Sequence, residues 1–330
     1  MTKQVSMDKI ISLCKRRGFI FPSSEIYGGL SAIYDFGPLG VELINNIKKE
    51  WWRLFVREQS NMVGLDASIL MNSLAWQASG HIQNFNEPLV ECKKCHQRFR
   101  ADHLLETVAA KPKHDKEQPK NIQDLACPEC GGQLTEPRDF NGMFKTFFGP
   151  NTDTASQIYL RPETAGGIFV NYKNVLQSSR LKVPFGIAQI GKAFRNEITV
   201  ENYIFRVREF EQFEIEYFIK PDQWEQAFTA WLELMKKWAK FIGVKSEHLV
   251  LHEIEEVDRA FYSKRTIDFE YTYPFGTKEL WGLAYRTDYD LSRHQQLAGI
   301  DLTYTDPDSG EKYLTHVIEP SLGLSGLAWN

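Results

Sequence analysis

Apolar and polar residues alternate with two different periods along the chain, and each period predicts a different kind of element. Helical spacing marks residues 41–60 and 221–243, and a shorter amphipathic helix is expected over residues 7–18. Strand-like patterns mark residues 184–197 and 205–220, and several short strands between Gly, Pro and Asp turns are expected over 266–330. Because strands and helices mix without a βαβ rhythm, the pattern predicts an α+β fold, in which helices flank an antiparallel β-sheet.

Composition adds limits to this picture. The chain has 330 residues, of which 42% are hydrophobic and 25% charged, as in ordinary globular proteins. A formal net charge of -4 argues against a wholly basic nucleic-acid-binding surface but permits a local basic track. No apolar run approaches the roughly 20 residues of a membrane helix, and the first residues lack a secretory signal. A cytoplasmic location without membrane contact is therefore expected.

Four of the five cysteines form two C-x2-C pairs, Cys92 with Cys95 and Cys127 with Cys130. Two thiolates two residues apart can hold one ion from a tight turn, and two such turns complete a tetrahedral site for a structural Zn²⁺. The alternative is four unrelated surface thiols. His96 and His103 are spare ligands or, more simply, exposed histidines. The pairs lie in residues 91–140, and the polar stretch 110–123 within this segment predicts a solvated loop in a small insertion.

Residues 205–220 form the most informative predicted strand. Its alternation sets Val207, Phe213, Ile215 and Tyr217 on a core-facing side. The opposite side carries Arg206, Arg208, Phe210, Gln212, Glu214 and Glu216. Arginines, an aromatic ring and acids are costly to bury without partners, and they suit phosphate, adenine and an ammonium group. This side is therefore predicted to be the floor of a polar cleft. The alternative is an exposed sheet face with ion pairs.

Several short segments carry a resemblance to a known family. Residues 194–197 (FRNE) resemble motif 2 of the class II aminoacyl-tRNA synthetases. A closer resemblance, to the dimeric glycyl-tRNA synthetases, rests on residues 76–81 (WQASGH), 160–165 (LRPETA), 208–212 (REFEQ), 286–291 (RTDYDL) and 316–321 (HVIEPS). The match extends over nearly the whole chain, including the cysteine pairs.

The resemblance implies a class II catalytic fold in three parts. Residues 1–90 would hold the first part of the core with motif 1, residues 91–140 the zinc-binding insertion, and residues 141–330 the rest of the core with motif 2 and a truncated motif 3. The helix over 41–60 resembles motif 1, which implies a homodimer. The implied reaction is ATP-dependent activation of glycine to glycyl-adenylate and transfer to tRNA(Gly), with ATP as substrate and Mg²⁺ and structural Zn²⁺ as bound metals.

The resemblance also implies residue roles. Arg195 would contact the ATP α-phosphate and Glu197 the adenine amine, and these two are the expected catalytic residues. Phe210 would stack under the adenine ring, and Glu279 would help hold Mg²⁺. The remaining expected ATP contacts are Asn196, Phe205, Arg206, Arg208, Leu280 and Gly323. The expected glycine contacts are Arg100, Glu163, Phe210, Gln212, Glu214, Glu319 and Ser321.

Three departures from the family pattern leave alternatives open. Gly326 stands where motif 3 is expected to carry an ATP-binding arginine, and the chain ends at Asn330 without the family's anticodon-binding domain. Gly166 replaces the usual glutamine, which is expected to enlarge or loosen the amino-acid end of the site. One alternative is therefore a synthetase-like protein that binds nucleotide or RNA with impaired or no aminoacylation. Another is a zinc-stabilised nucleic-acid-binding module without enzyme chemistry.

Overall fold

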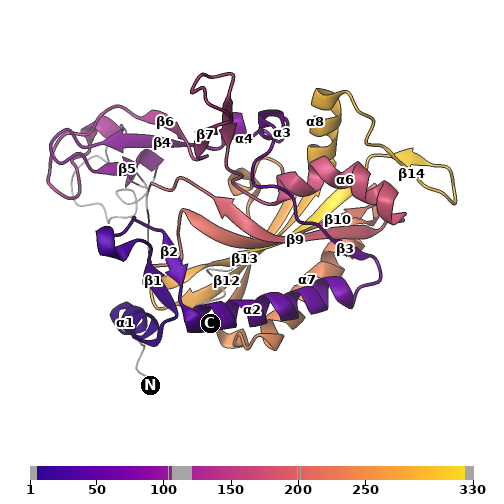
Figure 1. The fold of residues 1–330 in the computed structure, drawn as a ribbon, viewed down its shortest axis with the longest axis horizontal. Helices are drawn as coiled ribbons and strands as arrows, with labels where there is room; N and C mark the ends of the chain where they lie inside the picture. Colours follow the sequence, from indigo (N-terminus) through magenta and orange to yellow (C-terminus); the bar gives the residue numbers. More distant parts are fainter. Residues whose placement is uncertain (1–5, 103, 106–120, 199, 201, 324–330) are drawn as a thin grey trace.

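The computed structural model describes residues 6–323 except 103, 106–120, 199 and 201. A twisted central sheet runs across the molecule, with helices on both faces and a small separate sheet at one end (Figure 1). The predicted α+β architecture is therefore confirmed. Of the described residues, seven strands form the central sheet, in the order β11, β12, β13, β16, β10, β9 and β3.

The bounds of these strands, in the same order, are Leu249–Glu253, Arg265–Tyr273, Gly276–Thr287, His316–Gly323, Glu209–Ile219, Phe185–Phe194 and Met62–Gly64. Neighbouring strands are antiparallel except at one edge, where β3 runs parallel to β9. The register aligns Glu214 of β10 with Ser321 of β16, and Gln212 with Gly323. This alignment brings polar residues from two distant parts of the sequence to one end of the sheet.

Helices α2 (Pro38–Trp52) and α7 (Trp224–Phe241) cover one face of the sheet (Figure 1). The main hydrophobic core lies between them and the sheet. The indole of Trp51 stacks on the ring of Phe213, with the ring centroids 5.3 Å apart. Phe213 and Ile215 of β10 point into this core, as the alternating pattern predicts.

The opposite face is covered by α6 (Ala165–Ser179) together with α8 (Tyr289–Ala298) and α3 (Ser73–Ala78) (Figure 1). A second core lies under α6, where Phe169 packs edge-on against Phe218 of β10. Between these two cores, the same side of β10 carries the buried polar residues Gln212, Glu214 and Glu216. The polar cleft is therefore built into one face of a strand whose other face is core.

A smaller unit at one end of the molecule holds the cysteine pairs. Its sheet has the order β5, β4, β6, with bounds Arg98–Arg100, Asn86–Glu91 and Arg138–Asn141. Ile122 is buried in its small core, so the described end of the expected solvated loop packs inward. Residues 110–120 of that loop lie outside the described residues.

The remaining elements are short. The other helices are α1 Met7–Arg17, η1 Glu25–Tyr27, η2 Arg53–Arg57, α4 His81–Asn84, η3 Ile122–Asp124, η4 Pro221–Gln223, η5 Ser246–His248 and η6 Glu256–Asp258. The paired short strands are β1 Ile20–Pro22 with β2 Tyr34–Phe36, β7 Lys145–Phe147 with β8 Gln157–Tyr159, and β14 Tyr304–Thr305 with β15 Lys312–Tyr313.

Three sequence predictions need correction. The helix expected over 41–60 begins at Pro38 and turns into a π-helix after Trp52. The strand expected from residue 205 begins at Glu209, because the Arg208 amide donates to the Ala32 carbonyl before the main sheet pairing starts. Val207 therefore packs in a separate cluster with Ile20 rather than in the main core.

The last segment also differs from its prediction. Instead of several short strands, β12 and β13 are 9 and 12 residues long, and α8 intervenes before β16. Helix α8 buries only a few side chains, among them Asp290 and Leu291. Its weak apolar periodicity explains why the sequence pattern does not reveal it.

Candidate active site

A cavity of about 570 Å³ opens at the end of the sheet where β10, β13 and β16 meet. Its lining includes most of the residues expected to bind ATP or glycine. These are Glu163, Arg195, Glu197, Phe205, Arg206, Phe210, Gln212, Glu214, Glu279, Leu280, Glu319, Ser321 and Gly323. Side chains more than 100 residues apart in sequence thus meet in one hollow, and the exposed-sheet-face alternative is wrong for β10.

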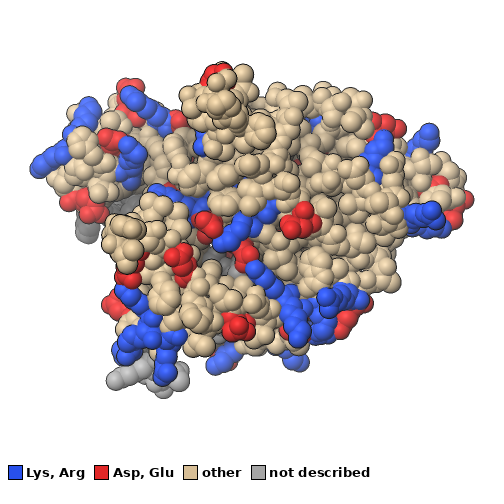
Figure 2. All heavy atoms as spheres, viewed as in Figure 1, with Lys and Arg blue, Asp and Glu red and all other residues tan. Residues whose placement is uncertain are grey.

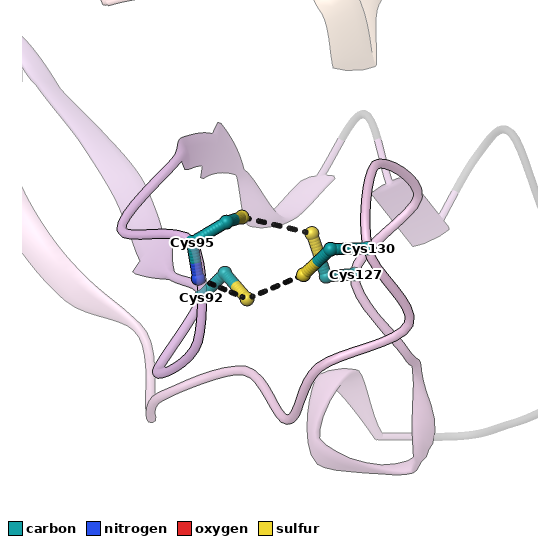
Figure 3. A group of neighbouring side chains, drawn as sticks. All are labelled: Cys92, Cys95, Cys127 and Cys130. Carbon is teal, nitrogen blue, oxygen red and sulfur yellow. Dashed lines mark hydrogen bonds between the residues drawn. The ribbon is translucent and has the colours of Figure 1, made fainter.

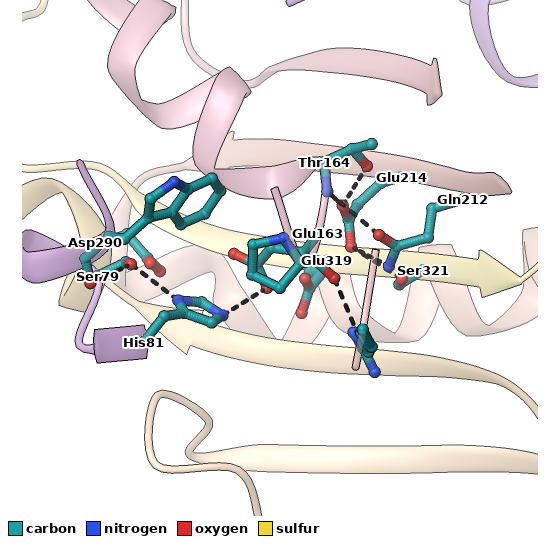
Figure 4. Close-up of polar contacts among 12 residues, drawn as sticks. Ser79, His81, Glu163, Thr164, Gln212, Glu214, Asp290, Glu319 and Ser321 are labelled. Atoms are coloured by element: carbon teal, nitrogen blue, oxygen red, sulfur yellow. Dashed lines mark hydrogen bonds and ion pairs between the residues drawn. The ribbon is translucent and has the colours of Figure 1, made fainter. Parts of the chain in front are cut away.

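The inner end of this cavity is acidic. Glu163, Glu214 and Glu319 are each at least 95% buried. The carboxylate of Glu214 accepts hydrogen bonds from the Thr164 amide at 3.0 Å, from the Thr164 hydroxyl and from the Ser321 hydroxyl at 2.9 Å (Figure 4). Glu216, one position deeper along this side of β10, is fully buried, and neither of its oxygens has a hydrogen-bond partner among the described residues.

One buried arginine neutralises part of this negative charge. Arg286 of β13 donates to Glu319 at 2.6 Å and makes a two-pronged contact with Asp290 at 2.8 and 2.9 Å. The ring of Tyr262 lies against the guanidinium, 3.7 Å from its central carbon to the ring centroid. A buried charge needs an opposite charge and hydrogen-bond partners, and each of the three guanidinium nitrogens of Arg286 donates to a carboxylate.

The carboxyl groups differ in their tendency to ionise. Burial raises the pKa of Glu319 to about 8 against the opposing charge of Arg286. Burial and the charge of Glu163 raise the pKa of Glu214. Although burial opposes it, the charge of His81 lowers the pKa of Glu163 to about 2. Burial and the charge of Glu319 raise the pKa of Glu216 well above its ordinary value. A cationic ligand group would stabilise the ionised forms of Glu214 and Glu319.

The outer end of the cavity carries arginines and an aromatic ring. The guanidinium carbon of Arg195 lies 5.3 Å from the ring centroid of Phe210, and its Nε donates to the Pro162 carbonyl at 3.0 Å. Arg206 lies 3.6 Å from the carboxylate of Glu197, whose pKa is raised by burial. Glu279 is an exposed acid of the same wall. This combination of cations, a flat ring and acids can bind a nucleoside triphosphate.

Three expected contact residues lie away from the main cavity. Arg100 and Asn196 line a smaller neighbouring hollow of about 190 Å³, which shares Arg195 and Glu197 with it. Arg100 there contacts Glu87 and Asp102, the latter at 2.6 Å. Arg208 donates to the backbone carbonyls of Glu197 and Ser31, each at 2.9 Å, so it braces the loop between β9 and β10.

The two departures that involve glycines have different outcomes. Gly166 lies in the first turn of α6, and a Cβ placed there would be 2.8 Å from the ring of Trp76. The expectation that Gly166 enlarges or loosens the site is therefore wrong, because the indole of Trp76 fills the space. Gly326 lies outside the described residues.

The four cysteines of the C-x2-C pairs come together as the spacing predicts (Figure 3). Their sulfurs all lie within 4.8 Å of one another, with Cys92 and Cys130 3.4 Å apart and Cys95 and Cys127 3.7 Å apart. A tetrahedral zinc with bonds of about 2.3 Å requires sulfur separations of about 3.8 Å. The backbone amides of Cys95 and Lys94 lower the pKa of the Cys92 thiol to about 6, which favours the thiolate that a metal needs.

The surroundings of the cysteines also suit a metal. Gly132 follows the second pair, and a Cβ there would lie 2.8 Å from the Cys92 sulfur. The alternative of four unrelated thiols is therefore wrong. His96 is exposed and pairs with Glu91 at 3.1 Å, so it is not a spare ligand. His103 lies outside the described residues.

Several residues of the site have no role in the sequence prediction. They are Ser79, His81, Thr164, Tyr262, Arg286 and Asp290. Five of them lie in the segments that carry the family resemblance, and those segments were the signal that could have pointed to them: Ser79, His81, Thr164, Arg286 and Asp290. Their partners are set by tertiary contacts, so the sequence did not show what they do. Tyr262 follows η6 in a loop without a motif.

The fold and cavity are those of a class II aminoacyl-tRNA synthetase core. The family profile described as "tRNA synthetase class II core domain (G, H, P, S and T)" matches residues 146–313. A solved prolyl-tRNA synthetase from Cryptosporidium parvum, complexed with halofuginone and AMPPNP, has a similar fold, with a TM-score of 0.63 at 11% identity over 98% of this chain and 52% of that one.

Closer relatives narrow the class to one family. A glycine–tRNA ligase from Alkaliphilus oremlandii is 51% identical over 99% of this chain and 73% of its own length. One from Treponema denticola is 52% identical over 98% of this chain and 69% of its length. One from Thermobifida fusca is 51% identical over 98% of this chain and 70% of its own length. The chain belongs to the glycine–tRNA ligase family.

Proposed function

We propose that this chain activates glycine with ATP to form glycyl-adenylate and transfers the glycyl group to tRNA(Gly). One observation carries the proposal: a single cavity joins a buried acidic end, formed by Glu163, Glu214 and Glu319, to an outer end with Arg195, Arg206 and Phe210. An ammonium group suits the first end and a triphosphate with its adenine suits the second. The family membership of the chain supports the same reaction.

For ATP, we assign the residues of the outer end. Arg195 would pair with the α-phosphate and stabilise the charge that develops as pyrophosphate leaves. Phe210 would stack under the adenine, and Glu197 would accept from its amine. Glu279 lies in the same wall as Asp268, and both have carboxylate oxygens within 4 Å of the Cβ position of Gly282. These oxygens suit Mg²⁺, which would neutralise phosphate charge.

Most of the remaining residues assigned to ATP lie in the walls of the cavity. Phe205, Arg206, Leu280 and Gly323 line it. Asn196 reaches the nucleotide from the neighbouring hollow, and Arg208 acts by holding the loop that carries Glu197.

For glycine, we assign the acids of the inner end. Glu163, Glu214 and Glu319 would surround the ammonium, with Ser321 and Gln212 completing the enclosure and Phe210 at its border with the nucleotide. A small pocket of this kind would clash with a β-carbon and so exclude larger amino acids. Arg100 would reach substrate from the neighbouring hollow, where it shares a wall with Arg195.

The chemistry needs no covalent enzyme intermediate. A carboxylate oxygen of glycine attacks the α-phosphorus, the bond to the β-phosphate oxygen breaks, and pyrophosphate leaves with the electron pair. A ribose hydroxyl at the 3′ end of the tRNA then attacks the glycyl carbonyl, and AMP leaves. Positioning and fixed charges carry both steps.

Zinc, dimerisation and domain organisation complete the proposal. Cys92, Cys95, Cys127 and Cys130 would hold a structural zinc, since four thiolates leave no open coordination position. We keep the division into residues 1–90, 91–140 and 141–330. On α2, Leu39 and Leu43 lie one turn apart on the same side of the helix and are both exposed, and exposed apolar residues of this kind suit a homodimer.

A cytoplasmic site of action also stays part of the proposal. Within the part of the chain that the structure describes, no helix is long and apolar enough to cross a bilayer. On the face drawn in Figure 2, basic and acidic side chains of the described residues are interspersed. On this face, a tRNA would therefore be held by local contacts rather than by a broad basic surface.

The decisive experiment is glycine-dependent ATP–pyrophosphate exchange by the purified, zinc-loaded chain. We expect exchange with glycine, weaker than in Gly326→Arg, which restores the arginine that the resemblance implies. Glycine should outcompete alanine and serine, and equal use of alanine would overturn the small-pocket argument. A folded chain without exchange in either form would instead be a synthetase-like nucleotide- or RNA-binding protein.

A further inference from the structure

The two carboxylate oxygens of Glu163 have different surroundings. Oε2 lies 3.3 Å from Nε2 of His81, and both side chains are about 95% buried. Oε1 has no hydrogen-bond partner among the described residues, although Glu163 lines the cavity. A buried carboxylate oxygen without a donor is costly, so this atom is suited to a donor that arrives with a ligand.

His81 is itself held in one orientation. Its Nδ1 lies 2.8 Å from the Ser79 hydroxyl oxygen (Figure 4). The ring packs edge-on against Trp76 on one side and Phe261 on another, with centroid separations of 5.6 and 6.2 Å. Gly80 between Ser79 and His81 has φ of +87°, which allows the sharp turn from α3 to α4. The imidazole therefore cannot rotate without breaking these contacts.

The carboxylate of Glu163 selects the state of His81, because a bare Nε2 would set its lone pair against Oε2 at 3.3 Å. If the imidazole is neutral and accepts from the Ser79 hydroxyl at Nδ1, its single N–H is at Nε2. If it is protonated, both nitrogens donate, and the Ser79 hydroxyl can donate instead to the Trp76 carbonyl at 3.3 Å. In both states Nε2 presents a hydrogen to Oε2 of Glu163.

We propose that Ser79 and His81 are positioning residues for glycine recognition: they hold Glu163 through Oε2, so that Oε1, which has no partner of its own, is a fixed acceptor for the glycine ammonium at the inner end of the cavity. This inference rests on the proposed function and adds two residues to it. Neither lines the cavity, so both act through Glu163. Because the carboxylate is already held in place, binding of the ammonium group does not have to order it. The effect of the two residues should therefore appear in the binding of glycine.

Steady-state exchange kinetics test the proposal. His81→Leu removes the N–H, whereas His81→Gln keeps an amide N–H that can reach Glu163. We expect His81→Leu to raise the KM for glycine by about 10- to 100-fold, the range of a hydrogen bond to a charged group, while the KM for ATP stays within about twofold. His81→Gln should recover most of the loss, and Ser79→Ala should show a smaller increase in the same parameter.

His248→Leu is the matched control, because His248 also lies beside a glutamate, Glu247 at 3.7 Å, but in an exposed short helix outside the lining of the cavity. It should leave the KM for glycine unchanged. A merely structural role for His81 would lower the thermal midpoint and change the KM values for glycine and ATP together in His81→Leu, with no rescue by glutamine. That result would overturn the proposal.

A second measurement does not depend on activity. In the wild-type chain with ¹⁵N-labelled histidine, the NMR signal of His81 Nε2 should be that of a protonated nitrogen, and Glu163→Gln should shift it. A bare Nε2 would overturn the positioning role even if exchange is normal. Conversely, absence of exchange in both the wild type and Gly326→Arg, with the expected NMR signal, would refute the proposed function and leave the contact between His81 and Glu163 established.

Discussion

Arg286 donates to Glu319 at 2.6 Å, and neither side chain is more than 5% exposed. The two residues are 33 positions apart and lie on the neighbouring strands β13 and β16. The same guanidinium contacts Asp290 of α8, so a single cation ties the acidic end of the cavity to a helix on its far side. The proposed glycine site and the packing of α8 therefore depend on one residue.

Substitution of Arg286 should be strongly destabilising. Arg286→Met would leave Asp290 buried without its counter-charge and Glu319 without its hydrogen-bond donor, and loss of one partner from a buried ion pair costs about 3–5 kcal/mol. We expect the free energy of unfolding to fall by about that amount in urea titrations. Arg53→Met is the control, because Arg53 also contacts two acids, Glu50 and Glu58, but in solvent. Equal stability losses in the two variants would contradict the assigned role of Arg286.

Stability should depend on pH through Glu319. Its pKa is about 8 in the folded chain, against an ordinary value of 4.5. Between these values the folded chain binds more protons than the unfolded chain, so this group stabilises the fold fully below about pH 4.5 and loses that effect as the pH rises toward 8. Glu216, whose pKa is raised too, acts in the same direction.

The measurement is the free energy of unfolding at several pH values between about 5 and 9 for the wild type and Glu319→Gln. The fall in stability with rising pH should be smaller in the variant. Glu233→Gln, at an exposed position of α7, should leave the slope unchanged. A steeper fall in Glu319→Gln would mean that the sign assigned to Glu319 is incorrect.

The cysteine site should bind one zinc per chain. Elemental analysis should find it in the wild type and in Cys14→Ser, whose cysteine lies outside the cluster, and should find less in Cys127→Ser. Because four ligands hold together a unit with a small core, chelation should increase amide hydrogen exchange in β4, β5 and β6. Exchange in the central strands β9 and β10 should change little. If chelation increased amide hydrogen exchange equally along the whole chain, the unit that holds the cysteines would not be a separate cooperative element.

Gly166→Ala should destabilise the chain although alanine favours helices. The added Cβ would meet the ring of Trp76 at 2.8 Å, and overpacking of this kind costs about 1–3 kcal/mol. In a Trp76→Leu background the same substitution should cost less, because the ring is absent. A double-mutant cycle measured by urea unfolding gives the coupling. Strict additivity would show that Trp76 is not the obstacle.

Short-range patterns account for the parts that could be predicted. The C-x2-C spacing predicts the cysteine cluster because each pair is made by one local turn. The alternation from Gln212 to Tyr217 predicts which face of β10 is polar, because successive side chains of a strand point in opposite directions. It fails at Val207, where the backbone has left the sheet. The spacing of apolar residues does not predict helix α8, because one of its few buried residues is the charged Asp290.

The sequence by itself determined the class of fold, the cluster of four cysteines, the polar face of β10 and the family, since each depends on the order of neighbouring residues or on short motifs. Only the tertiary structure decided how these parts meet. It placed Arg100 in a neighbouring hollow, put Trp76 against Gly166, and set His81 against Glu163. The physical reason is that such contacts depend on strand register and helix packing, which bring together side chains whose separation along the chain carries no signal.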